Sequence, residues 1–282
     1  MSRYDPQEEE PPSYNHAVQA SLSQDNIVYE FGKYRDASRN SFEQGEMFTQ
    51  AFRAQIDTFP HKLVGQVTQH GLVNVLQLDE TPHSNELFRH PKASSRCPPI
   101  RVEKQQLTFW PDRPSHCPPE DWEITAQATH PYLSLSDYTN AERTESVTHY
   151  FEITVESMAS DVLLAIGLAT QPYPLFRVVG WNRFSVGYHS DDGRKFCDDA
   201  TGGQDYGPSW TVGDTVGCGY QPEAGNIFFT LNGRIIDYAF VGLEKHNYFA
   251  SISADGPARV RVNFGQVPFI YAVGDSWAGT KI

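Results

Sequence analysis

The sequence predicts an all-β fold, a bent sandwich of two antiparallel sheets, and three observations indicate it. Runs in which apolar and polar residues alternate follow one another between residues 149 and 264. Turn signals separate these runs, and Asn232-Gly233 is the strongest of them. No comparable helical pattern lies between them. A series of short strands joined by tight turns is typical of an antiparallel sandwich.

Composition limits the classes of function. The 282 residues suit one large β unit with extensions, and the net charge of −13 disfavours nucleic acid and anionic membranes as partners. The longest apolar run, residues 162–169, is far shorter than the roughly 20 residues of a membrane-spanning helix. We find no signal peptide and no CxxC pair among four cysteines, so we expect a soluble cytoplasmic protein with reduced thiols.

Residues 1–147 divide into three predicted parts. Residues 1–40 are polar and lack an apolar period, so we expect a disordered tail. Residues 41–59 predict a short amphipathic helix that packs on the rest, in which Ser41 and Gln44 have capping-box spacing and Phe48 and Phe52 share a face. Residues 60–147 predict an extension that packs on the sandwich. Residues 62–78 could form strands or a helix, and their β-branched residues and two glycines favour strands. The prolines that follow predict short edge strands and loops.

The strands of the sandwich are predicted within residues 148–270, and residues 271–282 form a predicted C-terminal tail. In "YFEITV", residues 150–155, alternate side chains face the core, and the same holds for "VRVNFG", residues 260–265. The predicted inward side chains are Phe151, Ile153, Val155, Val260, Val262 and Phe264.

The segment 226–240 predicts a hairpin with Asn232-Gly233 as a type I′ turn. A two-residue loop opposes Leu231 to Arg234, Phe229 to Ile236 and Ile227 to Tyr238. This register places four side chains on the core face: Ile227, Phe229, Ile236 and Tyr238.

Two glycines weaken the predicted strand 213–220. Gly217 and Gly219 share one face, and glycine is unfavourable inside a strand unless another group comes close to it. We therefore expect a large ring to cross there, with Trp181 or Trp210 as candidates. A strand edge or a bulge is the alternative interpretation.

Several linked motifs resemble those of the SPRY domain. The segments "YFEITV", "AIGLA", "GWNRFSVGYHSDDGRKF", "YGPSWTVGDTVGCGY", "NIFFTLNGRIID" and "VRVNFG" occur in that family's order and spacing. The resemblance implies a concanavalin-like (B30.2-like) sandwich that binds other proteins and is not an enzyme. The segment 171–210 is most similar to fungal SPRY adaptors that bring membrane-protein cargo to a HECT-class ubiquitin ligase, and less to the Ran-binding protein M group. Recruitment to endosomal or vacuolar membranes would follow from that resemblance.

The N-terminal segment contains Pro11-Pro12-Ser13-Tyr14. The two prolines favour the polyproline II conformation that WW domains bind, and Tyr14 has the spacing that a second pocket requires. In the fungal adaptors such motifs recruit the ligase, so we predict the same for Pro11, Pro12 and Tyr14. The alternative is a chance pattern, which would leave a stand-alone protein-binding module.

The candidate target-binding surface is formed by two predicted loops, residues 172–184 and 202–208. Aromatic and arginine side chains on loops are frequent contacts for protein partners. The predicted contact residues are Tyr173, Phe176, Arg177, Tyr188, Asp205 and Tyr206. For Tyr188, Trp181 and Phe184, the alternative is a place in the core.

No pattern predicts catalysis, a cofactor or a metal. GxSxG, HExxH, Walker and GxGxxG motifs are missing from the sequence. Asp191 and Asp192 could suggest a calcium loop, but the spacing lacks the ligands of an EF-hand, and a hairpin turn is the preferred interpretation. Sugar binding by Trp181 or Tyr206, and a hydrolase built on a lectin-like sandwich, are weaker alternatives.

Overall fold

The computed structural model describes residues 37–79, 99–111, 122–139, 145–274, 276–280 and 282. The predicted tail at 1–40, with Pro11, Pro12 and Tyr14, therefore lies almost entirely outside the described residues. Cys97 and Cys117 lie outside them as well, whereas Cys197 is partly buried and Cys218 is buried.

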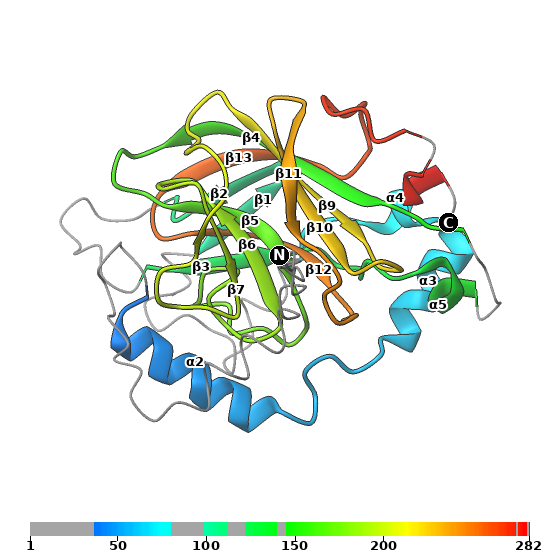
Figure 1. Ribbon diagram of the computed structural model, residues 1–282, viewed down its shortest axis with the longest axis horizontal. Helices are drawn as coiled ribbons and strands as arrows, with labels where there is room; N and C mark the ends of the chain where they lie inside the picture. The colour runs from blue at the N-terminus through cyan, green and yellow to red at the C-terminus, as the bar shows by residue number, and fades with distance from the viewer. Residues whose placement is uncertain (1–36, 80–98, 112–121, 140–144, 275, 281) are drawn as a thin grey trace, which may run out of the picture.

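Two antiparallel sheets form the sandwich, which confirms the predicted fold class (Figure 1). The seven-stranded sheet contains, in spatial order, β1 (Ile100–Glu103), β2 (Gln106–Phe109), β13 (Ala258–Asn263), β4 (His149–Met158), β9 (Thr215–Gln221), β10 (Asn226–Leu231) and β11 (Arg234–Phe240). The six-stranded sheet contains β3 (Ile124–Gln127), β12 (Phe249–Ala254), β5 (Leu164–Ala169), β6 (Ser185–His189), β7 (Arg194–Cys197) and β8 (Gln204–Asp205).

The main core lies between the sheets and follows the predicted alternation. Phe151, Ile153 and Val155 of β4 are buried, as are Val260 and Val262 of β13 and Phe264 just after it. Glu152, which alternation places on the outer side, is buried too, because its carboxylate accepts hydrogen bonds from the Ile270 backbone N–H (3.1 Å) and from Asn263 Nδ2 (3.1 Å). The chain after β13 thus covers the outer face of β4.

The β10–β11 hairpin confirms the turn and corrects the register. Asn232 and Gly233 have φ values of 51° and 77°, as a type I′ turn requires, and Leu231 opposes Arg234. Two irregularities then shift the pairing, so that Phe229 opposes Asp237 and Ile227 opposes Phe240. Ile227 and Phe229 remain in the core. Ile236 is partly buried and packs against the main core, as predicted, whereas Tyr238 is 42% exposed, so its predicted place on the core face is wrong.

Close approach at the glycines of β9 is confirmed, but by different rings. A Cβ on Gly217 would lie 2.0 Å from the Tyr150 hydroxyl oxygen, and one on Gly219 would lie 2.1 Å from Cζ of Phe228. Tyr150 comes from the neighbouring strand β4 and Phe228 from β10. Trp181 and Trp210 do not make these contacts.

Among the described residues, the helices flank the sandwich: α2 (Arg39–Phe52), α3 (His61–His70), α4 (Leu72–Val75), α5 (Leu135–Thr139) and the short 3-10 helix η2 (Ala278–Thr280). The predicted helix exists but begins earlier than its capping box implied. Ser38 is the N-cap, since its Oγ accepts a hydrogen bond from Ser41 N at 3.1 Å.

The strand prediction for residues 62–78 is wrong, because α3 and α4 occupy this segment. Val64 and Val67 of α3 are buried one helical turn apart, and Leu72 and Leu76 follow them into the main core. This packing overrides the β preference of the valines. Gly71, with a φ of 82°, separates the two helices.

Strands that precede residue 148 complete both sheets. β1 and β2 extend the seven-stranded sheet beside β13, and β3 forms one edge of the six-stranded sheet beside β12. At the other end of the chain, Trp277 forms a β-bridge with Thr148.

Replacing Gly233 tests the hairpin. Gly233→Val should destabilise the protein by about 1–3 kcal/mol, because a β-branched residue is strained at positive φ and its Cβ would lie 2.7 Å from Cγ2 of Ile270. Urea unfolding measures the change. Gly242→Val is the matched control: its φ is also positive, at 68°, but no atom lies within 4 Å of its Cβ, so it should cost less. An unchanged unfolding midpoint for Gly233→Val would contradict the turn.

Candidate protein-binding surface

The loop between β5 and β6 lies on the outer face of the six-stranded sheet. Alternate residues of β5 belong to different clusters: Ile166 and Leu168 pack in the main core, whereas Ala165 and Ala169 pack in a second one. The second cluster consists of Ala37, Leu163, Ala165, Ala169, Tyr173, Val178, Val179, Trp181, Phe196 and Ala200. The loop thus closes a second core on the side of the sheet away from β4.

Hydroxyl groups of the sheet hold the backbone of this loop. Buried peptide groups need hydrogen-bond partners, and a loop has no ladder to provide them. Thr125 Oγ1 donates to the Arg177 carbonyl (2.5 Å), Ser253 Oγ accepts from Val179 N (2.9 Å), and Ser185 Oγ accepts from Gly180 N (3.0 Å). These side chains come from β3, β12 and β6, so three strands anchor the loop.

His189 adds a fourth anchor. Its Nε2 donates to the Val179 carbonyl at 2.9 Å, and its ring stacks on Phe196 with centroids 4.0 Å apart. Burial lowers the pKa of His189 to about 4, despite the opposing effect of the carbonyl. The histidine is therefore neutral at pH 7.

Half of the predicted contact residues are buried, which corrects the prediction that they form an exposed surface. Tyr173 and Arg177 are buried beneath the loop, and Tyr188 is buried between the sheets. The physical reason is that the loop folds back onto the sheet instead of projecting into solvent. Trp181 is buried, as its alternative interpretation held, whereas Phe184 is only partly buried.

Hydrogen bonds and the ring of Trp181 hold the side chain of Arg177 inside the protein. Its Nη1 donates to Ser41 Oγ (3.0 Å), its Nη2 donates to the Trp181 carbonyl (3.0 Å), and its guanidinium lies over the Trp181 ring at 5.7 Å. Desolvation lowers the pKa of the guanidinium, which nevertheless stays charged. Ser41 belongs to α2, so Arg177 joins the loop to that helix.

Helix α2 covers the loop from the solvent side (Figure 1). Gly45 allows close approach, because a Cβ there would lie 2.5 Å from Asn182 Oδ1. Asn182 Nδ2 donates to Thr49 Oγ1 at 3.1 Å, and the ring of Phe48 packs edge-on to the ring of Phe176 at 6.3 Å. Helix α2 of the same chain thus covers the loop that was predicted to bind the target.

The second predicted loop, residues 202–208, includes the edge strand β8 and lies apart from the first loop. Asp205, in the edge strand β8, has a side chain that is 93% exposed and an ion pair with Arg194 at 3.2 Å. Tyr206 is partly buried: its hydroxyl donates to the Asp237 carbonyl (2.5 Å) and accepts from Phe229 N (3.2 Å). The six predicted residues therefore do not form one continuous patch.

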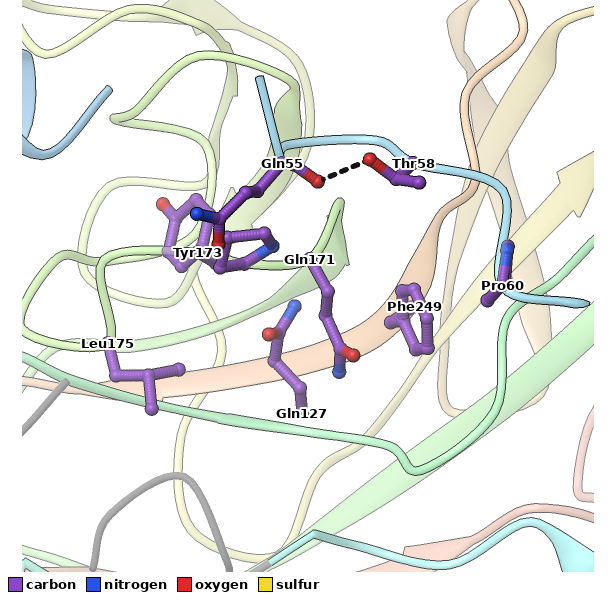
Figure 2. A pocket seen from close by; sticks show the side chains of 9 residues that line it. Gln55, Thr58, Pro60, Gln127, Gln171, Tyr173, Leu175 and Phe249 are labelled. Carbon is purple, nitrogen blue, oxygen red and sulfur yellow. Dashed lines mark hydrogen bonds between the residues drawn. The ribbon is translucent and has the colours of Figure 1, made fainter. Parts of the chain in front are cut away.

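A cavity of about 310 Å³ was not foreseen from the sequence (Figure 2). It lies between the α2–α3 linker and the sandwich, and it is lined by Gln55, Thr58, Pro60, Gln127, Gln171, Pro172, Tyr173, Leu175 and Phe249. These residues come from four separate parts of the chain, so no local motif could have indicated the site.

In the described parts of the chain, no three His, Cys, Asp or Glu side chains lie together as metal ligands would. No helix among the described residues combines the length and the apolar character needed to cross a bilayer.

Comparison with known proteins gives consistent matches. A family model described as the SPRY domain matches residues 148–267. Protein ssh4 of Sclerotinia sclerotiorum is 40% identical over 127 residues, which are 45% of this chain and 24% of that protein. Ran-binding protein 9 of Xenopus tropicalis is also 40% identical over 127 residues, which are 23% of its length. A crystal structure of a human SPRY domain aligns with 60% of this chain and 98% of its own, with 23% identity and a TM-score of 0.46. The chain spans about a quarter of the length of these curated relatives.

Acid should destabilise the protein through its buried histidines. Burial lowers the pKa values of His189 and His149 to about 4, below the ordinary histidine value of 6.5, so between pH 6.5 and 4 the unfolded chain binds protons that the folded chain does not. Stability is thus complete above pH 6.5 and falls by up to about 3 kcal/mol per histidine as the pH drops towards 4. His189→Asn should flatten the dependence of the melting temperature on pH. His70→Asn, at the exposed end of α3, should not. An equal slope in all three proteins would contradict this origin.

Alanine substitutions in two helices test whether α2 packs against the loop between β5 and β6. Gly65→Ala in α3 meets no atom within 4 Å and should stabilise the protein by up to about 1 kcal/mol through helix propensity. Gly45→Ala in α2 has the same propensity gain but brings Cβ against Asn182, so it should destabilise by about 1–2 kcal/mol. Urea unfolding midpoints provide the comparison. Equal stabilisation by both changes would show that α2 does not rest on the loop.

Proposed function

We propose that this SPRY domain protein, a relative of the fungal ssh4 proteins, is a non-enzymatic adaptor that links a target protein to a ubiquitin ligase. The SPRY sandwich would hold the target, and Pro11-Pro12-Ser13-Tyr14 would recruit a HECT-class ligase through its WW domains. The proposal is carried by one observation: a chain whose residues 148–267 match the SPRY domain also contains a Pro-Pro-x-Tyr motif.

The motif suits a weak and reversible contact. Pro11 and Pro12 already favour polyproline II, so little chain entropy is lost when they enter an aromatic groove, and Tyr14 fills a second pocket. Such a small surface implies micromolar affinity, about −7 to −8 kcal/mol. A second contact, through the target or another part of the ligase, would raise the effective affinity.

The target-binding part of the proposal rests on the residues that keep exposed surface. Of the six predicted residues, these are Phe176, Asp205 and Tyr206, and Asp205 is by far the most exposed. Since Arg177 anchors α2 from within, its replacement would disturb the fold and could not test a surface contact. Asp205 is the better probe.

The place of action follows from the same resemblance. We propose that the protein is cytoplasmic and reaches endosomal or vacuolar membranes by binding membrane-protein cargo. Ubiquitination of that cargo would then direct its sorting. Fractionation with and without cargo expression would show whether the protein moves to membranes.

Replacing Tyr14 tests the adaptor role. Tyr14→Ala should abolish binding of an isolated WW domain to a peptide of residues 8–19, because alanine leaves the tyrosine pocket empty. In cells the full chain with Tyr14→Ala should still bind its target but fail to promote its ubiquitination. Tyr4→Ala, in the same segment but outside the motif, should behave as the wild type.

Two further outcomes distinguish the two parts of the proposal, target binding and ligase recruitment. Asp205→Lys should lose both target binding and ubiquitination, whereas Glu103→Lys, the same charge change at an exposed position of β1, should lose neither. Equal target ubiquitination in the wild type and in Tyr14→Ala would refute ligase recruitment and leave a stand-alone protein-binding module.

A further inference from the structure

The cavity beneath the α2–α3 linker has the composition of a ligand site. Its volume, about 310 Å³, is at the lower end of the range for small-ligand pockets. The walls are mainly apolar, formed by Pro60, Pro172, Tyr173, Leu175 and Phe249. Its polar side chains are chiefly three carboxamides, and none of the lining residues carries a charge.

Gln127 presents an unused acceptor in this cavity. The residue is only 3% exposed, and its Nε2 faces the Ala169 and Thr170 carbonyls at 3.4 Å and Ser251 Oγ at 3.2 Å. Only an NH₂ group can face two carbonyls, so the neighbours determine the orientation of the amide. No described residue donates a hydrogen bond to its Oε1. Gln127 Oε1 is not one of the buried side-chain atoms left without a partner, so this oxygen is accessible from the cavity, where an N–H of a ligand can take the place of water.

The other two carboxamides are also weakly bonded. Gln171 Nε2 lies 3.4 Å from the Ala128 carbonyl, which is long for a hydrogen bond, and no described residue bonds to the side chain of Gln55. In Figure 2, Gln55 projects from the linker on one side, while Gln127 and Gln171 lie together on the sandwich side. Hydrogen-bond donors and an acceptor therefore face the cavity from two sides.

We propose that this cavity binds the carboxamide side chain of an asparagine or glutamine. Such a group can direct one of its two N–H donors at Gln127 Oε1 and its carbonyl oxygen at the NH₂ groups of Gln171 or Gln55. Its planar, uncharged form fits between proline and aromatic walls. A carboxylate would lack the donor and would find no cation among the lining residues. That the side chain belongs to the target protein rests on the proposed function.

Three matched peptides test the chemistry. The full-length, ¹⁵N-labelled protein would be titrated with acetylated and amidated Gly-Asn-Gly, Gly-Asp-Gly and Gly-Leu-Gly. The asparagine peptide should shift the side-chain NH₂ signals of Gln127 and Gln171 with a Kd on the order of 1 mM. The isosteric aspartate peptide and the leucine peptide should bind at least about tenfold more weakly. Equal binding of all three peptides, or no binding of the asparagine peptide at 10-fold higher concentration (about 10 mM), would overturn the proposal.

Variants at the mouth of the cavity locate the binding. Gln55 and Thr58 are exposed, so Gln55→Leu and Thr58→Trp should preserve the fold, which the melting temperature would verify. Thr58→Trp should narrow the entrance and weaken the asparagine peptide at least about tenfold, and Gln55→Leu should weaken it less. Gln69→Leu, an exposed glutamine of α3 outside this cavity, is the control and should change nothing. Wild-type affinity in Thr58→Trp would place the binding elsewhere and refute the assignment.

The peptide titration contains no ligase, so its outcome is independent of the adaptor role. If the asparagine peptide binds as expected while Tyr14→Ala leaves target ubiquitination intact, the adaptor role fails and the carboxamide site stands. If Tyr14→Ala abolishes ubiquitination but the three peptides bind equally, the site fails and the adaptor role stands.

Discussion

The buried loop between β5 and β6 depends on the hydroxyl groups beneath it. A loop without a hydrogen-bond ladder can be buried only if side chains satisfy its peptide groups. Thr125, Ser253 and Ser185 do so at Arg177, Val179 and Gly180 respectively. Because they hold the loop against the sheet, Ala165 and Ala169 on the outer face of β5 lie in a second core and not in solvent. The sandwich thus has a third layer on this side.

That third layer places helix α2 and the carboxamide cavity. The guanidinium of Arg177, in the loop, donates a hydrogen bond to Ser41 of α2, and this bond joins the helix to the loop. The linker that follows α2 carries Gln55 and Thr58 over the ends of β3 and β12, which closes the cavity. Since the Pro-Pro-x-Tyr motif precedes α2 in the chain, a ligase bound there would be tethered to the sandwich through this helix.

On the opposite face of the sandwich, glycines allow aromatic rings to lie directly against a strand. Tyr150 and Phe228 cross the glycines of β9 on the outer side of the seven-stranded sheet. Tyr238 reaches the same side because the bulged register of β11 turns it away from the core, and its ring packs edge-on to Phe228 at 5.9 Å. One extra residue in a strand was enough to move a predicted core side chain to the surface.

The sequence by itself determined the features that depend on neighbouring residues. The alternation in β4 and β13, the Asn232-Gly233 turn and the close approach at Gly217 and Gly219 follow from side-chain period, backbone sterics and the missing Cβ of glycine. The tertiary structure alone decided whether a loop side chain is exposed, and it buried Tyr173 and Arg177 by folding their loop onto the sheet. It also made a helix of residues 61–70 and brought Gln55, Gln127 and Gln171 together. These outcomes depend on contacts between segments far apart in the chain, whose energies no local pattern contains.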